Sequence, residues 1–173
     1  MERCKKDIVA LLNVRNRLME ADKQGLWEYH FPEVAATHEE VMEIQGKLNL
    51  TLSEEYKTFL LCANGWKCFF QMVDLFGTKE LISDKMEFAR EILAEEMEYD
   101  LELQELKNYL LPIAMSEDDK DLFVMVLADG ERFGEVIWLA GGEIERFKSF
   151  LDFFESMIKY NEGEVERMLT KNT

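Results

Sequence analysis

Hydrophobic residues recur at helical spacing in the first part of the chain. Residues 5–24 predict an amphipathic helix, and Gly25 marks the point where we expect it to end. Residues 26–36 contain three aromatic side chains and a proline without helical spacing. This segment predicts a loop or a short extended piece.

Two further helix starts can be identified from their capping residues. Thr37 followed by Glu40 has the spacing of a capping box, in which each residue bonds to the backbone N–H of the other. Ser53 predicts the cap of the next helix. We expect Asn64-Gly65 to end that helix, because both residues tolerate the left-handed backbone of a C-cap.

The middle of the chain combines an apolar run with a strongly acidic one. Residues 67–76 predict one or two strands, and residues 78–84 a short helix or turn. Residues 85–107 predict one long acidic helix, anchored on its apolar side by Phe88, Ile92, Leu93 and Tyr99.

From residue 110 onward, short runs of Val, Ile, Leu and Phe alternate with turn residues, as is typical of strands. Asp129-Gly130 between two apolar runs favours a hairpin. Residues 144–160 then predict a helix, with a weaker one over 164–169. The three predicted strands, expected to form an antiparallel meander, are residues 110–115, 122–127 and 134–139.

Length and charge narrow the class of protein. The chain has 173 residues, of which 47% are hydrophobic, so it can form one domain with a substantial core. Residues 31–173 carry a net charge of −17, and the whole chain carries −16. Such a field repels nucleic acid and attracts a basic protein, although it could equally serve only to keep the chain in solution.

No catalytic residue, metal site or cofactor is expected from the motifs. The three cysteines form no CxxC pair, and the two histidines lie in no metal-binding motif. Lys67 predicts a slightly lowered pKa for the thiol of Cys68. With no apolar signal segment and no run long enough for a membrane span, we expect a cytoplasmic protein with no membrane partner.

The acidic helix is the most informative surface feature. Five of its glutamates are spaced by 4, 4, 3 and 4 residues, which places them on one helix face. That face could be a docking surface for a basic protein or merely a solvated face. We also expect a carboxylate-rich loop and a tryptophan to take part in partner binding. The tryptophan could anchor an interface or belong to the core. The predicted partner-binding residues are Glu87, Glu91, Glu95, Glu98, Glu102, Asp118, Asp119 and Trp66.

Several short motifs, taken in order, resemble the SUKH superfamily over residues 38–160. They are Leu52-Ser53-Glu54-Glu55-Tyr56-Lys57-Thr58-Phe59-Leu60 with Asn64-Gly65, Leu111-Pro112-Ile113, Asp121-Leu122, Gly134-Glu135-Val136, and Ser149-Phe150-Leu151-Asp152-Phe153-Phe154. Ser53 stands where the superfamily usually has proline, but serine also starts helices well. This superfamily groups bacterial immunity proteins against polymorphic toxins with a fungal regulator of cell-wall assembly.

The resemblance implies an α+β fold and a binding role. A mainly antiparallel sheet of about four to six strands would pack against N-terminal and C-terminal helices in a single domain (1–173), with the acidic helix as an insertion. The chain would be a non-enzymatic immunity protein that binds a basic toxin domain, with a nuclease as the favoured kind of toxin. Two alternatives stay open: a regulatory adaptor for signalling proteins, and an enzyme with an acidic, metal-dependent site at Asp118, Asp119 and the Glu87 face.

Overall fold

The computed structural model describes residues 1–128 and 130–171. The elements of the first half are α1 (Glu2–Ala21), α2 (His38–Leu48), α3 (Glu54–Leu60), β1 (Trp66–Phe70), β2 (Val73–Leu75) and the 3-10 turn η1 (Glu80–Ile82). Those of the second half are α4 (Asp84–Met97), α5 (Leu101–Leu106), β3 (Leu110–Met115), β4 (Leu122–Val126), β5 (Val136–Leu139), β6 (Glu143–Phe147) and α6 (Phe150–Lys171).

The six strands form one sheet in sequence order, and each strand is antiparallel to the next. The sheet is strongly curled. Neighbouring strands lie about 4.8 Å apart, so a flat sheet would separate β1 from β5 by about 19 Å. Yet the rings of Phe70 on β1 and Trp138 on β5 have centroids 6.1 Å apart. The strand pairing confirms the predicted antiparallel sheet and gives it six strands.

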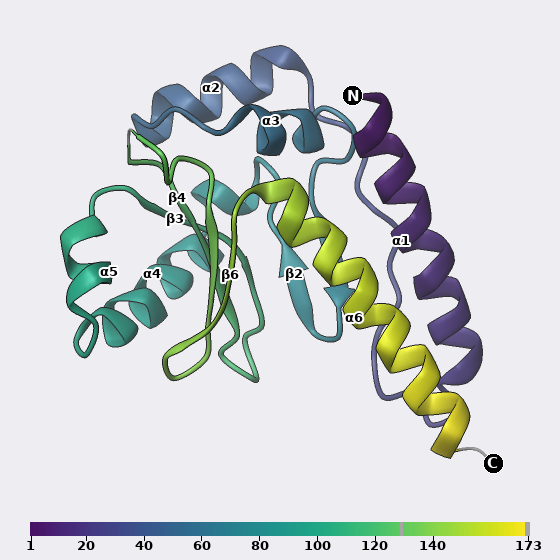
Figure 1. Ribbon diagram of the computed structural model, residues 1–173. Coiled ribbons are helices and arrows are strands. Elements are labelled where there is room, and N and C mark those ends of the chain that lie inside the picture. Colours follow the sequence, from purple (N-terminus) through teal and green to yellow (C-terminus); the bar gives the residue numbers. More distant parts are fainter. Residues whose placement is uncertain (129, 172–173) are drawn as a thin grey trace.

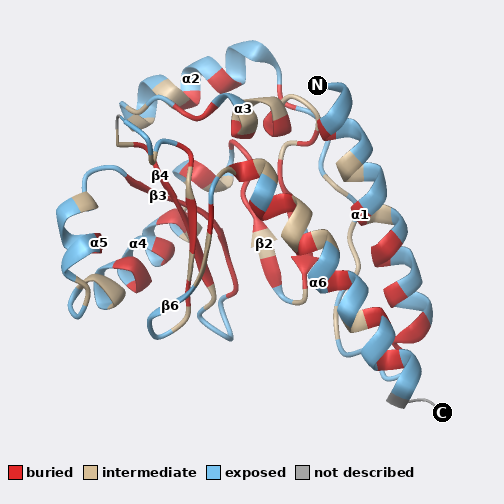
Figure 2. Ribbon diagram, viewed as in Figure 1, coloured by how far each residue is buried: buried red, intermediate tan, exposed pale blue. Residues whose placement is uncertain are grey.

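Helices cover both faces of this sheet (Figure 1). α4 and α5 lie on one side, α6 lies on the other, and α1 packs on the outer side of α6. α2 and α3 lie across one end of the sheet. Because β3 and β4 are covered on both faces, every one of their residues is buried (Figure 2). The α+β fold with N-terminal and C-terminal helices is confirmed.

Phe153 lies at the centre of the contact between α6 and the sheet. Its ring centroid is 5.9 Å from that of Phe69 on β1, 5.2 Å from Phe123 on β4 and 5.7 Å from Phe147 on β6. One side chain therefore ties the helix to strands from both ends of the curled sheet. A second, smaller apolar cluster joins α1 to the end of α6 through Leu18 and Val165.

The predicted helix starts are confirmed. Thr37 Oγ1 accepts from the N–H of Glu40, and the Glu40 carboxylate accepts from the N–H of Thr37, which completes the capping box. The Ser53 hydroxyl caps α3 by accepting from the N–H of Tyr56. These signals act over only three residues, so they do not depend on the rest of the fold.

The predicted end of α3 at Asn64-Gly65 is wrong, because the helix stops at Leu60. Asn64 instead holds the turn before η1: its side-chain oxygen accepts from the N–H of Thr78 at 2.7 Å. A Cβ at Gly77 would lie 2.0 Å from the carbonyl oxygen of Asn64, so only glycine fits there. Asn64-Gly65 thus serves a long-range contact between two loops.

The single acidic helix predicted over 85–107 is also wrong. α4 ends at Met97, and a new helix, α5, begins after Asp100. The Asp100 carboxylate accepts from the N–H groups of Glu102 and Leu103, as an N-cap does. Aspartate stabilises a helix start better than a helix interior, which favours the break.

The C-terminal helix begins later than predicted. Residues 143–147 form β6, paired with β5, and α6 starts at Phe150, where the Ser149 hydroxyl accepts from the N–H of Asp152. The separate helix predicted over 164–169 is the continuation of α6. Of the predicted hairpin residues Asp129-Gly130, Asp129 lies outside the described residues. None of the described helices is both long and apolar enough to cross a membrane.

Candidate protein-binding surface

Three of the predicted acidic residues form a continuous stripe on α4. Glu87, Glu91 and Glu95 follow one another at intervals of four residues, and all three are exposed. The opposite side of the helix buries Ala89 and Ile92 against the core. The amphipathic pattern therefore directs these carboxylates toward solvent.

The break between α4 and α5 changes the rest of the stripe. Glu98 is the C-cap of α4, and Glu102 lies on α5. The Glu102 carboxylate lies 2.6 Å from the Arg132 guanidinium and 2.8 Å from that of Arg146. Hydrogen bonding and attraction to Arg146 and attraction to Arg132 lower the pKa of Glu102. Glu102 thus binds the β4–β5 connection and β6 and is not free for a partner.

Glu95 is also engaged within the molecule, since Lys120 Nζ lies 3.2 Å from its carboxylate. Within residues 1–128 and 130–171, by contrast, Glu87, Glu91 and Glu98 are exposed and have no ion-pair partner. Asp118 and Asp119 are exposed in the same β3–β4 loop as Lys120. The Lys120 ion pair holds this loop beside α4, so the loop carboxylates extend the α4 surface.

Trp66 does not belong to this surface. Its side chain is 1% exposed at the start of β1, and its ring Nε1 donates to the backbone carbonyl of His30 at 2.8 Å. The prediction that Trp66 anchors an interface is therefore wrong, and its alternative, a core residue, holds. Burial with a satisfied indole N–H is the usual state of a core tryptophan.

The turn between α4 and α5 exposes two large apolar residues. Tyr99 is 91% exposed and Leu101 is 77% exposed. The prediction that Tyr99 anchors the buried side of a long helix is wrong, because the helix ends at Met97. The α4–α5 break, signalled only by Asp100, is what brings both residues to the surface.

Beside this turn lies a pocket of about 440 Å³, with Leu103 and Leu139 among its apolar residues and Glu96 and Glu143 among its acidic ones. The Glu96 carboxylate accepts from the N–H of Gly141, which holds the β5–β6 turn against α4. We refer to the turn between α4 and α5, together with the adjoining glutamates of α4, as the acidic corner. Its defining residues are Glu87, Glu91, Glu98, Tyr99 and Leu101.

Fold and surface together define a class: an α+β protein with a six-stranded antiparallel meander and an acidic helical surface with exposed apolar residues. The family model of the SMI1/KNR4 family (SUKH-1) matches residues 35–156 of the chain. The chain belongs to this family, which is consistent with an immunity or regulatory protein. The match includes the sheet, α4 and α5, and leaves out α1 and most of α6. No curated protein matches the chain.

Proposed function

We propose that the chain is an immunity protein that binds a basic toxin domain through the acidic corner. The observation that carries this proposal is the exposure of Tyr99 and Leu101 among unpaired carboxylates. Exposed apolar side chains surrounded by polar ones are typical of protein interaction sites, and tyrosine is enriched among the residues that dominate binding energy.

The charge of the corner favours a basic partner. Glu87, Glu91 and Glu98 form no ion pair among the described residues, and the chain as a whole carries −16. Opposite charge on a partner would accelerate encounter and orient it. A nuclease toxin fits this description because enzymes that bind nucleic acid present basic grooves. An acidic corner seated in such a groove would exclude the substrate.

The experiment is a pull-down from the source cell with three baits. One is the wild-type chain, and the second carries Glu87→Gln, Glu91→Gln and Glu98→Gln. The control neutralises three exposed glutamates on other helices: Glu20→Gln on α1, Glu39→Gln on α2 and Glu162→Gln on α6. Both variants have the same net charge, so a difference between them reports the location of the charges.

We expect the wild-type and control baits to retain one basic protein that elutes as salt is raised, and the corner variant to lose it. Co-expression then separates the two roles of the family. An immunity protein rescues cells from the captured toxin, whereas a regulator captures signalling proteins and rescues cells from no toxin. Equal capture by the corner variant and the control would refute the acidic corner as the binding site.

A further inference from the structure

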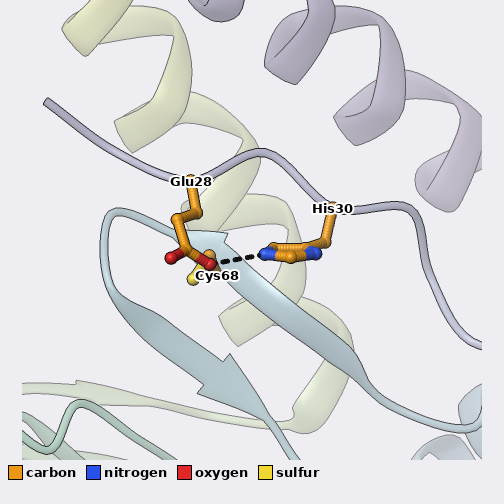
Figure 3. A group of neighbouring side chains, drawn as sticks. All are labelled: Glu28, His30 and Cys68. Atoms are coloured by element: carbon orange, nitrogen blue, oxygen red, sulfur yellow. Dashed lines mark hydrogen bonds and ion pairs between the residues drawn. The ribbon is translucent and has the colours of Figure 1, made fainter. Parts of the chain in front are cut away.

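Three side chains with metal-binding atoms converge beside β1. Glu28 and His30 come from the loop after α1, and Cys68 comes from β1 (Figure 3). The carboxylate oxygen, ring nitrogen and sulfur of the three residues all lie within 4.8 Å of one another. Glu28 Oε2 and His30 Nε2 are 2.8 Å apart.

Each of the three residues is held by a separate contact. The Arg15 guanidinium, buried between α1 and α6, donates to the carbonyl of Glu28 at 2.8 Å. Trp66 Nε1 donates to the carbonyl of His30 at 2.8 Å. Groups that fix the backbone in this way pre-organise the side chains they carry, as supporting residues do around metal ligands.

Cys68 is held in an unusual conformation for its position in a strand. Its φ is +50°, in the left-handed region that residues other than glycine seldom adopt, and its N–H donates to Asp74 Oδ1 at 2.7 Å. The register between β1 and β2 shifts at this point. This local irregularity re-aims the side chain, as bulges commonly do, and the thiol lies beside the Glu28 carboxylate (Figure 3).

We infer that Glu28, His30 and Cys68 form a binding site for a divalent transition metal ion, with Zn²⁺ the best match. Zn²⁺ accepts thiolate, imidazole and carboxylate ligands together, whereas Mg²⁺ and Ca²⁺ prefer oxygen alone. Bond lengths of about 2.0–2.3 Å place tetrahedral ligand atoms about 3.3–3.8 Å apart. A shift of about 1 Å by the exposed Glu28 side chain or the half-exposed His30 ring would bring the three ligand atoms to these distances.

Two features determine how tightly the ion binds. Glu28 and Cys68 also line a surface pocket of about 530 Å³, so a fourth ligand can reach the ion from solvent. Lys67 Nζ lies 3.0 Å from Glu28 Oε2 and competes with the ion for that carboxylate. Removing this ammonium group is therefore expected to strengthen metal binding.

The predicted lowering of the thiol pKa of Cys68 is wrong, because burial and the neighbouring Asp74 carboxylate raise it, outweighing Lys67.

The test is a titration of the full chain with Co²⁺ as a spectroscopic probe, kept reduced and followed by absorption, with Zn²⁺ added afterwards. We expect one equivalent of Co²⁺ to produce a thiolate charge-transfer band and strong visible bands, which Zn²⁺ abolishes. Cys68→Ser should remove the thiolate band and weaken Zn²⁺ binding about tenfold or more. His30→Gln should weaken it similarly, and Lys67→Met should strengthen it.

The chain supplies matched controls, because it has a second histidine and two further cysteines. Cys62→Ser and His38→Gln should bind both metals as the wild type does, and circular dichroism verifies that each variant is folded. The inference is overturned if excess Co²⁺ gives no thiolate band and equilibrium dialysis shows no Zn²⁺ uptake. It is equally overturned if Cys68→Ser and His30→Gln, both folded, bind Zn²⁺ as tightly as the wild type.

Discussion

Replacing Phe153 with alanine removes the side chain that joins α6 to the sheet. The ring is 0% exposed and lies within 6 Å of the rings of Phe69, Phe123, Phe147 and Phe150. A buried Phe→Ala change costs about 3–5 kcal/mol through lost burial and the cavity left behind. Ring pairs add to burial, so we expect a loss near the upper end, about 4–5 kcal/mol.

Urea denaturation followed by circular dichroism measures this loss, provided that the denaturant dependence of the two chains is the same. For a chain of this length, about 4–5 kcal/mol corresponds to a fall in Tm of roughly 8–20 °C. The matched control is Phe31→Ala, since Phe31 is 73% exposed; its loss should stay below about 0.5 kcal/mol. A loss below about 1.5 kcal/mol for Phe153→Ala would refute this account of the core.

Three further changes test local features. Trp66→Phe keeps a ring but removes the N–H that donates to His30; the free energy of unfolding should fall by about 1–2 kcal/mol in urea, and no change would contradict this bond. Thr37→Ala removes the helix cap and should cost about 1 kcal/mol in the same assay, an unchanged midpoint being the opposing result. Pairing with Arg146 lowers the pKa of Glu102, so its stabilisation is present above the unfolded pKa of about 4.3 and is lost as pH falls below it. The Tm of Glu102→Gln should therefore fall less than that of the wild type between pH 6 and pH 3. An equal fall in Tm for the two chains would contradict the pairing.

Elements with local signals could be predicted from the sequence, and elements decided by distant partners could not. The Thr37–Glu40 box acts within one turn of helix, so it was predicted correctly. Ile144 and Phe147 are three residues apart and fit a helix, but pairing with β5 makes this segment a strand. The pattern of residues 85–107 fits one helix, but Asp100 caps a second helix and so divides the segment.

The same distinction applies to the surfaces. The exposure of Glu87 and Glu91 follows from the helical period and was predicted. The exposure of Tyr99 follows from the helix break and was missed. The proximity of Glu28, His30 and Cys68 could not be predicted, because Cys68 lies far from Glu28 in sequence and contacts such as that of Arg15 bring the two segments together.

Binding through the acidic corner can be measured as the affinity of the captured basic partner for the chain at a series of salt concentrations. Neutralising Glu87, Glu91 and Glu98 removes three exposed charges worth about 0.2–1 kcal/mol each if they are paired across the interface. For the corner variant we predict an affinity about tenfold weaker and a shallower salt dependence, with the Glu20, Glu39 and Glu162 control close to the wild type. Equal affinities and equal salt dependence for the corner variant and the control would contradict it.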